Sequence, residues 1–517
     1  MYREKHPYSL TRLFFQAAEG NPSREVLRDE HGQVDYATLA GRVKELALSL
    51  IKEGLKPGDR VAFLFPNSID YVMVHYAVMS AGGVSVPMDN FISEKNLAFQ
   101  IKDTEARFFL FDQSHWNKVS GSDLPEMDFV ACNGKRPDGN TAPFSRMADI
   151  NQMISPKHTG TLPDVMPEQR AMIIYTTGTT GRQKGVSLSH SNLVISAMNI
   201  METCEVTADD CELTALPQTR LFGLAHIHGY LSLGARMMLI KNLILPQKVL
   251  PLIEEIGATS FPNVPTAFTI MMDQYGELLK KYGSRLRYIL MCSAACKPER
   301  YKQMKSMLPD VRIFHSYGLT EAARTTIIEL DREPDRLLSV GKPTPGMTVS
   351  IVREDRIMPA DEAGEVVIQG PIVTEGYWKL PEENKRVFSR HGFHTGDMGI
   401  LDEEGYLFLV GRIKDIINVS GLKVNPAEIE DVLHNFPGIK DVAVVGFPDE
   451  TGSLNEKIVV FYVTEDGQPI ELKSIRHFCV QYLEQYKVPV HAEQIDEIPK
   501  TVSGKIQRNR LRETCHF

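Results

Sequence analysis

The sequence predicts an α/β protein with a large N-terminal part and a small C-terminal part. From residue 37 to residue 88, apolar residues at helical spacing alternate with short apolar runs, a rhythm typical of a mostly parallel sheet. The same rhythm resumes at residue 171 and continues to about residue 330. Turn signals then multiply up to residue 413, which indicates a β-rich region. The last hundred residues favour a compact α+β unit.

The first elements follow one another with clear boundaries. Residues 56–59 read Lys-Pro-Gly-Asp and end the first helix, and two glycines end the second. Residues 113–168 are rich in Asp, Gly, Pro and Ser and predict surface connections, with an edge strand near 127–131. In order, the pattern predicts a helix, a strand, a helix and a strand at residues 37–55, 60–64, 69–81 and 84–88.

The last hundred residues contain one helix and two strands that can be placed. Residues 426–435 predict a helix, because a proline near the first turn suits a helix start. Residues 442–445 and 458–463 predict strands. We expect the domain boundary near residues 412–415, which gives an N-terminal domain of 1–413 and a C-terminal domain of 414–517.

Composition excludes several classes of protein. The 517 residues are 43% hydrophobic and 24% charged, as in globular proteins and unlike disordered or fibrous chains. At roughly 150 residues per domain, this length predicts about three domains, or one large and one small. The formal net charge of -9 disfavours general binding to nucleic acid, although a local anion site remains compatible with it.

Cysteines and apolar runs point to the cytoplasm. The seven cysteines are scattered and contain no C-x-x-C pair, so we expect free thiols in a reducing compartment. Charges interrupt the N-terminus before any apolar run of signal-peptide length. No run of 18 apolar residues exists, so no integral membrane segment is expected.

A loop rich in threonine and glycine is the first candidate for chemistry. Residues 171–190 read AMIIYTTGTTGRQKGVSLSH, an apolar strand that runs into this loop. Glycine lets the backbone approach a ligand closely, hydroxyls donate to phosphate oxygens, and Lys184 adds a positive charge. The loop is not a Walker A motif, because no glycine stands five residues after Gly178 or Gly181 and the following segment predicts a strand. The alternative is a polar hairpin between two strands.

The segment TTGTTGRQKGV resembles the signature loop of the adenylate-forming superfamily, which includes acyl- and aryl-CoA synthetases, peptide-synthetase adenylation domains and beetle luciferases. Thr177 replaces a serine and keeps its hydroxyl, and Gln183 replaces a proline. Four further segments resemble that family in the same order: residues 315–321 (HSYGLTE), 394–397 (HTGD), 411–430 (GRIKD to PAEIE) and 499–505 (PKTVSGK). The resemblance extends over essentially the whole chain.

This resemblance implies a fold and a reaction. The expected N-terminal domain has two α/β sheet subdomains and a distorted β-barrel, and the expected C-terminal domain is small, mobile and α+β. The implied enzyme uses ATP and Mg²⁺ to turn a small carboxylic acid into an acyl-adenylate with release of pyrophosphate. A thiol, that of CoA, then displaces AMP.

The resemblance also assigns roles residue by residue. Lys505 is implied to be the adenylation lysine, and Glu321 to help hold Mg²⁺ beside Thr320. Lys184 and the loop are implied to hold the phosphates, Tyr317 to stack on adenine, and Asp397 with Arg412 to bind ribose. Lys414 corresponds to the hinge, and Ser420 and Gly421 to the thiol channel. The full expected ATP/AMP-binding set is Thr176, Thr177, Gly178, Thr179, Thr180, Gly181, Ser293, Ala294, Ala295, Ser316, Tyr317, Gly318, Asp397 and Arg412.

The acid pocket is less well defined by the sequence. Arg220 either contacts a polar or anionic part of the substrate, or a phosphate, or points outward into a salt bridge. His226 is either a pocket residue or a buried, hydrogen-bonded histidine. No aspartate stands where amino-acid adenylation domains use one, which disfavours α-amino acids. The residues implied to line the pocket are Thr219, Arg220, Phe222, Gly223 and His226.

Three other functions remain open from the sequence. A free-standing adenylation enzyme that loads a carrier-protein thiol would share the first half-reaction. A non-catalytic nucleotide-binding regulator is disfavoured by the intact Lys184, Glu321, Asp397, Arg412 and Lys505. A light-emitting oxidase has no specific residue in its favour. We expect a monomer or a homodimer.

Overall fold

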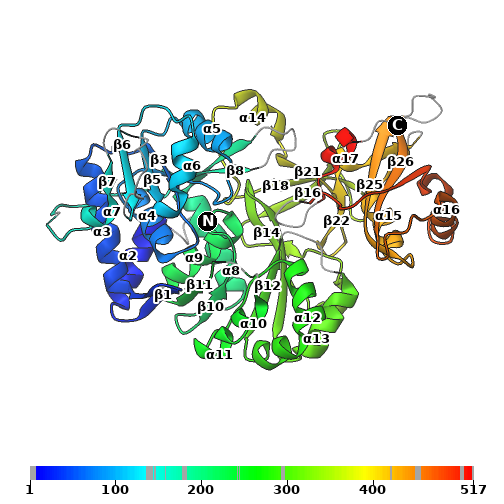
Figure 1. The fold of residues 1–517 in the computed structure, drawn as a ribbon, viewed down its shortest axis with the longest axis horizontal. Coiled ribbons are helices and arrows are strands. Elements are labelled where there is room, and N and C mark those ends of the chain that lie inside the picture. The colour runs from blue at the N-terminus through cyan, green and yellow to red at the C-terminus, as the bar shows by residue number, and fades with distance from the viewer. Residues whose placement is uncertain are drawn as a thin grey trace. The chain divides into compact units, whose positions relative to one another are not determined.

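The computed structural model divides the chain into two compact units (Figure 1). Unit 1 comprises Met1–Val349 and Ile368–Phe393, and unit 2 comprises Ser350–Val367 and His394–Phe517. The sequence predicts that residues 414–517 form a mobile domain, and this boundary between residues 413 and 414 stays a prediction. The structure describes residues 7–134, 144, 147–157, 159–176, 183–241, 243, 245–292, 297–419, 422–448, 456–500 and 506–514.

An eight-stranded sheet forms the first layer of unit 1. Strands β4, β3, β5, β6 and β7 run parallel to one another, β8 is parallel to β4, and β9 is antiparallel to both β8 and β19. In spatial order the strands are β19 (Gly376–Tyr377), β9 (Lys184–Ser189), β8 (Arg170–Thr176), β4 (Val84–Pro87), β3 (Arg60–Leu64), β5 (Phe108–Asp112), β6 (Phe129–Asn133) and β7 (Ala148–Asp149).

The helices of this layer begin at polar caps. Asp35 and Ser68 accept from the third residue of α3 and α4, and Ser189 forms a capping box with Asn192 at the start of α8. The predicted helices 37–55 and 69–81 are confirmed as α3 and α4. The helices are α3 (Tyr36–Lys52), α4 (Ile69–Ser80), α5 (Glu94–Thr104), α6 (Trp116–Gly121), α7 (Ile150–Met153) and α8 (His190–Thr203), with a 3-10 turn, η1 (Gln113–His115).

Unit 1 also contains two four-stranded sheets. One has the order β10 (Cys211–Thr214), β11 (Arg236–Leu239), β1 (Glu25–Asp29), β2 (Gly32–Asp35). The other has the order β12 (Tyr288–Cys292), β13 (Arg312–Leu319), β14 (Ala322–Glu329), β15 (Lys342–Pro343). Ser260 bridges them, because it pairs with both Glu212 and Tyr288. The remaining helices of unit 1 are α2 (Leu10–Gly20), α9 (Leu221–Leu233), α10 (Pro246–Val249), α11 (Leu252–Glu255), α12 (Pro265–Gly283), α13 (Pro298–Met307), η2 (Pro334–Arg336) and α14 (Pro381–Val387).

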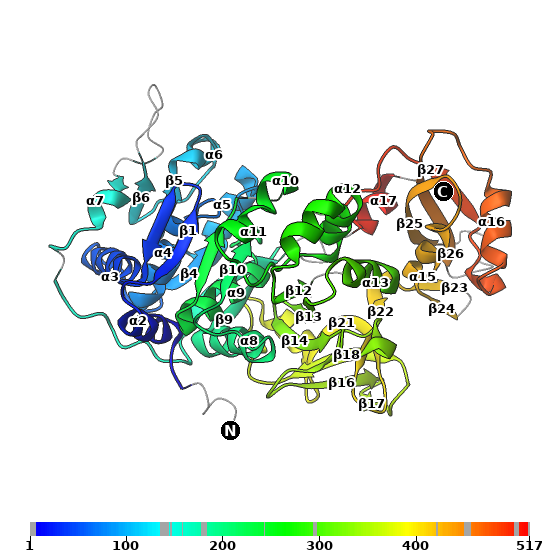
Figure 2. The ribbon, with the colours of Figure 1, turned by 90° about the horizontal axis from the view of Figure 1, so that it is seen from below.

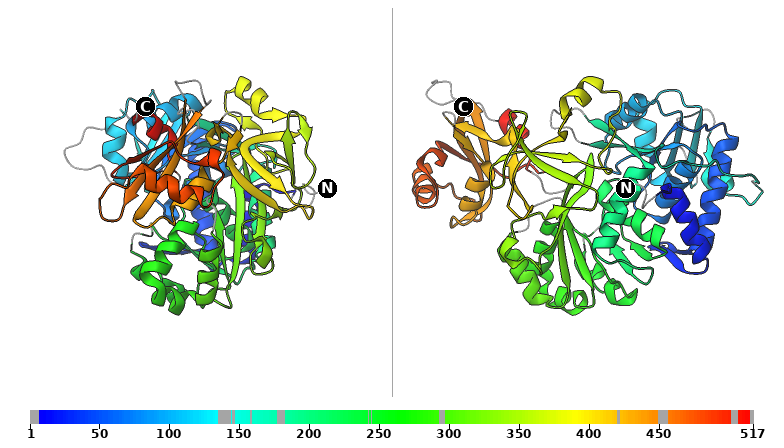
Figure 3. Two further views of the ribbon diagram at one scale, coloured as in Figure 1. Left: turned by 90° about the vertical axis from the view of Figure 1, so that its right-hand side faces the viewer. Right: turned by 180° about the vertical axis from the view of Figure 1, so that it is seen from behind.

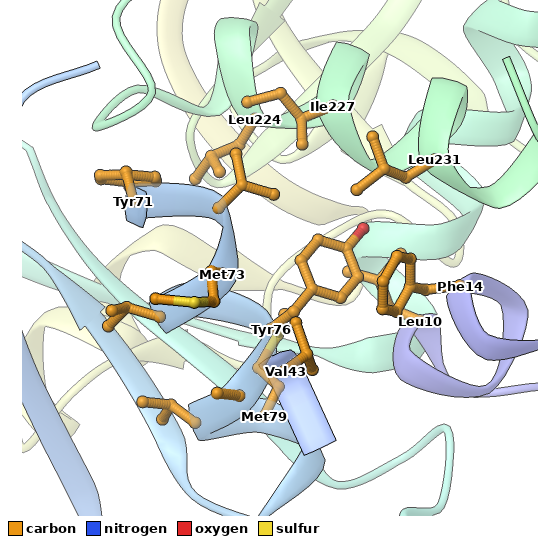
Figure 4. Packing of buried hydrophobic residues seen from close by; sticks show 14 of the residues in the cluster. Leu10, Phe14, Val43, Tyr71, Met73, Tyr76, Met79, Leu224, Ile227 and Leu231 are labelled. Atoms are coloured by element: carbon orange, nitrogen blue, oxygen red, sulfur yellow. The ribbon is translucent and has the colours of Figure 1, made fainter. Parts of the chain in front are cut away.

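The core of unit 1 surrounds α4. Every residue of this helix except Asp70 is buried, so it has no polar face. Figure 4 shows Tyr71 and Tyr76 of α4 facing Leu224 and Leu231 of α9 and Phe14 of α2. Figure 2 shows α2 and α3 side by side next to this core.

A six-stranded sheet and a C-terminal α+β group follow. The six strands are β17 (Arg356–Ile357), β16 (Thr348–Arg353), β18 (Gly364–Gln369), β21 (Gly392–Leu401), β20 (Phe388–Ser389) and β22 (Leu407–Arg412). The C-terminal group has the elements β23 (Ile417–Val419), β24 (Leu422–Val424), α15 (Pro426–Leu433), β25 (Ile439–Pro448), β26 (Glu456–Thr464), α16 (Leu472–Val480), η4 (Gln485–Lys487), β27 (His491–Gln494) and α17 (Arg508–Thr514). Figure 3 shows the long β25–β26 hairpin in orange with the orange-red helices beside it.

The sequence predictions for these elements are largely confirmed. The mixed α/β class, the β-rich stretch after residue 330 and the C-terminal helix and strands all appear, with β25 and β26 longer than predicted. The predicted edge strand near 127–131 is wrong in one respect: β6 pairs with β5 on one side and with the two-residue β7 on the other. Within the described residues, no helix is long and apolar enough to cross a bilayer. The five described cysteines are free and buried.

Two glycines offer a matched test of this packing. Gly341 has a φ of +94°, and a Cβ there would lie 2.1 Å from the Ile327 carbonyl oxygen, whereas Gly41 lies inside α3 with open space around it. We expect Gly341→Ala to lower the free energy of unfolding by at least about 2 kcal/mol. We expect Gly41→Ala to raise it by about 0.5–1 kcal/mol, because alanine favours a helix. Denaturant titration of both variants measures this, and equal effects would contradict it.

Candidate functional site

The threonine- and glycine-rich segment connects two antiparallel strands. β8 and β9 pair with each other, and Thr176 stands opposite Lys184. The strand that the sequence predicted after residue 185 is thus confirmed as β9. The Thr176 hydroxyl lies 3.5 Å from the Lys184 carbonyl oxygen. A Cβ at Gly185 would lie 2.9 Å from Ile173, so glycine permits the close approach of the two strands. Thr177, Gly178, Thr179, Thr180 and Gly181 lie outside the described residues.

Lys184 lies in a cluster of charged and aromatic side chains. Its ammonium group forms an ion pair with Glu383 of α14 and lies 4.9 Å from the centre of the Tyr377 ring. The Tyr377 hydroxyl donates to Oε1 of Glu321 at 2.7 Å. One cation, two carboxylates and a phenol thus lie together, and they come from β9, the β13–β14 turn and the β19–α14 segment. The pairing of β19 with β9 contributes to this arrangement, because it places Tyr377 opposite Val186. We call Lys184, Glu321, Tyr377 and Glu383 the Lys184 cluster.

The protonation of the Lys184 cluster follows from its surroundings. Burial and the neighbouring Glu321 carboxylate raise the pKa of Tyr377, so this phenol remains a hydrogen-bond donor. Burial alone would raise the pKa of Glu383, but hydrogen bonds from Lys184 and Arg386 outweigh it and lower the pKa. Glu383 is therefore a carboxylate at neutral pH, and it compensates the charge of Lys184.

Thr320 and Glu321 form the turn between β13 and β14. Glu321 is 9% exposed, and its carbonyl oxygen accepts from the Thr374 amide at 2.8 Å. Ser316 and Tyr317 are buried on β13. Gly318 lies so close to β14 that a Cβ would be 2.4 Å from the Arg324 nitrogen. The structure therefore brings the predicted Ser316–Glu321 segment to the same edge as Tyr377.

Asp397 and Arg412 are cross-strand partners in unit 2. They stand opposite each other on β21 and β22, and the Arg412 Nε donates to Asp397 Oδ1 at 2.6 Å. Arg412 also donates to the Thr395 carbonyl oxygen, and the Asp397 amide donates to the Thr395 hydroxyl. The two residues implied to bind ribose thus lie side by side, with their side chains held by local hydrogen bonds.

Lys414 follows Arg412 on a short 3-10 turn, η3 (Ile413–Asp415). Burial lowers the pKa of its ammonium group, although Asp415 acts in the opposite direction. Several other predicted residues lie outside the described part of the chain: Ser293, Ala294, Ala295, Ser420, Gly421 and Lys505.

Arg220 lies directly before α9 and pairs with an acidic residue. Its guanidinium group forms a salt bridge with Asp89 at 2.9 Å, and the arginine side chain is 47% exposed. Thr219 is buried, and Gly223 approaches the Pro217 carbonyl oxygen so closely that a Cβ would lie 2.5 Å away. Arg220 therefore forms a salt bridge in this structure, and its contact with a substrate stays a prediction.

His226 belongs to a fully buried hydrogen-bond network. Its Nδ1 lies 2.7 Å from Glu212 Oε2, which also accepts from the Ser260 hydroxyl. Tyr230 connects Ser260 to Tyr288. Within the described residues, His226 Nε2 and Glu212 Oε1 have no hydrogen-bond partner. His226 is therefore a buried, hydrogen-bonded histidine, which was one of the two alternatives that the sequence left open. The centres of the His226 and Phe222 rings lie 5.5 Å apart.

Sequence reasoning missed three residues of this region: Tyr377, Glu383 and Arg324. Tyr377 and Glu383 lie far along the chain from Lys184 and belong to no quoted motif. The sequence contained a weak signal for Arg324, since this cation follows the HSYGLTE segment by three residues in a stretch with an otherwise strand-like pattern. No described group of three or more His, Cys, Asp and Glu side chains could hold a metal ion by itself.

The chain belongs to the family of AMP-binding enzymes, the adenylate-forming enzymes. The model of that family, described as "AMP-binding enzyme", matches residues 14–378. A second model, "AMP-binding enzyme C-terminal domain", matches residues 428–505. The two matches together explain why the signature segments occur in a fixed order along one chain.

Individual relatives are similar over nearly the whole chain. An oxalate–CoA ligase of Arabidopsis thaliana is 31% identical over 97% of this chain and 97% of its own. A 2-succinylbenzoate–CoA ligase of Bacillus cereus is 29% identical over 96% of this chain and 97% of its own. The solved structure of ATP-bound MatB from Rhodopseudomonas palustris has a TM-score of 0.86 and 28% identity, with 98% of each chain covered.

The buried network makes a prediction about stability. Glu212→Ala removes the acceptor for both His226 and Ser260 in a fully buried place, so we expect it to lower the free energy of unfolding by about 3 kcal/mol. Arg220→Gln is the control, because it breaks a partly exposed salt bridge and we expect a loss of at most about 1 kcal/mol. Denaturant titration compares the two variants. A loss at Glu212 no larger than that at Arg220 would contradict the structural role of this network.

Proposed function

We propose that the protein is an ATP-dependent, AMP-forming acid–CoA ligase. It activates a small carboxylic acid to an acyl-adenylate with release of pyrophosphate, and then transfers the acyl group to the thiol of CoA. Membership of the AMP-binding enzymes supports the first half-reaction, and the CoA ligases among the relatives support the second. The observation that carries the proposal is the Lys184 cluster, which places a cation and a carboxylate beside the threonine- and glycine-rich segment.

The Lys184 cluster suits the phosphate end of ATP. Lys184, with Thr176, Thr177, Gly178, Thr179, Thr180 and Gly181, would offset negative charge on the β- and γ-phosphates. Glu321 fits Mg²⁺, because one protein carboxylate together with substrate phosphates is a common set of ligands for this ion. The donated bond from Tyr377 orients Glu321 and leaves its second oxygen for a ligand. Mg²⁺ would neutralise charge on the phosphates, and Thr320 lies next to it in the turn.

We assign the remaining nucleotide contacts residue by residue. Tyr317 would stack on adenine beside Ser316, Gly318 and the 293–295 segment, Ser293, Ala294 and Ala295. Asp397 would accept from the ribose hydroxyls, and Arg412 would hold its carboxylate in place. Thr219, Phe222, Gly223 and His226 would border the acid.

The second half-reaction requires a change of arrangement. We assign Lys505 to adenylation, Lys414 to the hinge, and Ser420 and Gly421 to the thiol channel, with residues 414–517 as the mobile part. Rotation at the hinge would exchange Lys505 for the thiol channel between the two halves. CoA is the proposed acceptor, and a carrier-protein thiol is the alternative. Free, buried cysteines support a reducing, cytoplasmic location.

The direct test mixes the protein with ATP, Mg²⁺, CoA and a panel of aliphatic, aromatic and dicarboxylic acids. Mass spectrometry then follows AMP and thioesters. We expect AMP together with one CoA thioester. AMP without a thioester would support a carrier-protein acceptor, and no AMP with any acid would contradict the proposal.

Lys505→Ala separates the two half-reactions. Lys505 supplies a positive charge only while the acyl–phosphate bond forms, so we expect adenylation to slow by about 10²-fold or more. Thioester formation from supplied acyl-adenylate should change much less. Single-turnover rates of both halves measure this, and an equal loss in both would contradict the assignment.

Glu383→Gln tests the ion pair in the Lys184 cluster. The carboxylate of Glu383 competes with phosphate for Lys184, so its neutralisation should strengthen ATP binding about fivefold. Glu382→Gln is the matched control on the same helix, because Glu382 pairs with the exposed Lys385 and not with Lys184. Calorimetric titration with ATP measures both. Weaker ATP binding by Glu383→Gln alone would show that the pair holds Lys184 in place instead of competing.

A further inference from the structure

Arg324 is a buried arginine in a strained backbone conformation. It lies on β14, is 3% exposed and has a φ of +63°, which a residue with a side chain adopts only at a cost. The register of β13 and β14 shifts between Tyr317 and Leu319, so β14 bulges at Arg324. A bulge of this kind redirects a side chain and occurs often beside active sites.

The guanidinium group of Arg324 has polar neighbours but no carboxylate among the described residues. Nη1 donates to the Ser316 hydroxyl at 3.3 Å, and Nη2 donates to the Phe222 carbonyl oxygen at 3.1 Å. The group also lies 4.3 Å from the centre of the Phe222 ring. Its Nε is buried and has no hydrogen-bond partner within the described part of the chain.

Among the residues that the structure describes, no carboxylate lies at ion-pair distance from this cation. Glu212 acts on Arg324 electrostatically, but within the described residues it makes no ion pair with it and already accepts from His226 and Ser260. The Cys292 side chain is a further hydrogen-bond partner of Arg324 and is not a carboxylate. Burial lowers the pKa of the Arg324 guanidinium, which is the expected effect of removing a cation from water without a close counter-ion. An unpaired buried cation is costly, and an incoming anion at this place would be bound correspondingly strongly.

The location of Arg324 connects the two parts of the proposed site. Phe222 belongs to the residues proposed to border the acid, and Ser316 belongs to the segment proposed to hold AMP. Both contact the same guanidinium group. Arg220, the other arginine considered for this place, is already paired with Asp89.

We propose that Arg324 binds the second carboxylate of a dicarboxylic acid, and that the enzyme selects dicarboxylic acids over monocarboxylic acids of the same shape. The inference rests on the proposed acid–CoA ligase function and adds its substrate class. Each Nη group already gives one N–H to Ser316 or Phe222, and the unpartnered Nε is the donor that a carboxylate would meet first; the planar guanidinium suits a carboxylate. Phe222 lies against the face of the guanidinium and keeps it in place.

The first experiment compares ligands on the unaltered protein. Aliphatic dicarboxylic acids of two to about eight carbons and aromatic dicarboxylic acids are each paired with their monomethyl ester, which keeps the shape and one carboxylate. Melting temperature reports binding, and AMP formation reports kcat/KM. We expect at least one diacid to raise the melting temperature more than its ester, and to exceed it about a hundredfold in kcat/KM. Equal results for every pair overturn the proposal.

Variants then assign the preference to Arg324. Arg324→Gln should reduce the diacid-to-ester ratio of kcat/KM to near one while the ester itself changes less than about threefold. Arg324→Lys should restore part of the ratio, because it keeps the charge without the planar guanidinium. Arg332→Gln, at an exposed arginine of the same unit, should change neither. An equal loss for diacid and ester in Arg324→Gln would mean a structural role and would overturn the proposal.

The two readouts separate this proposal from the function on which it rests. If no acid forms AMP, the ligase function fails, and the melting temperatures still decide about Arg324. A diacid-selective rise that Arg324→Gln abolishes would then support the anion site, and no selective rise would overturn it. If Arg324→Gln does not fold, the pairwise comparison on the unaltered protein decides alone.

Discussion

The pairing of β9 with two strands determines the geometry of the candidate nucleotide site. β8 holds it on one side through the hairpin register, and β19 holds it on the other with Tyr377 opposite Val186. This second pairing brings a segment almost two hundred residues downstream onto the signature hairpin, so that Lys184 meets Glu383. Because a slip of one residue turns every side chain to the opposite face, the register of β9 determines whether cation and carboxylates lie together.

Beneath this site, polar groups lie in an apolar core. Glu212, His226 and Ser260 are fully buried, and each lies on a different segment of unit 1. Buried polar groups rigidify a structure when their hydrogen bonds are complete and are costly when they are not. Although His226 Nε2 and Glu212 Oε1 have no partner among the described residues, the bond between His226 and Glu212 ties α9 to β10. The first turn of α9 carries Phe222 and Gly223. The position of the proposed acid pocket thus depends on hydrogen bonds made within the protein.

Particular residues show how far the sequence predicts this protein. The strand after Gly185 and helices 37–55 and 69–81 followed from local patterns, because turn residues and periodicity act over short distances. Asp397 and Arg412 are cross-strand partners, and their implied role in binding ribose stays a prediction. Tyr377, Glu383 and Arg324 could not be found in this way, since tertiary pairing and a local bulge place them. The salt bridge of Arg220 likewise depends on Asp89, which is remote in sequence.

The burial of α4 has a consequence for biosynthesis. This helix leaves the ribosome long before α9, whose Leu224 and Leu231 face it and whose His228 lies 3.0 Å from His75. Elements made before α9, namely α2, α3, β1 and β4, also pack against α4. Until α9 is made, however, the side of α4 that faces α9 is uncovered, and exposed apolar surface favours aggregation. Slow synthesis between residues 81 and 220 would lengthen the time for which this apolar side of α4 is exposed in the nascent chain.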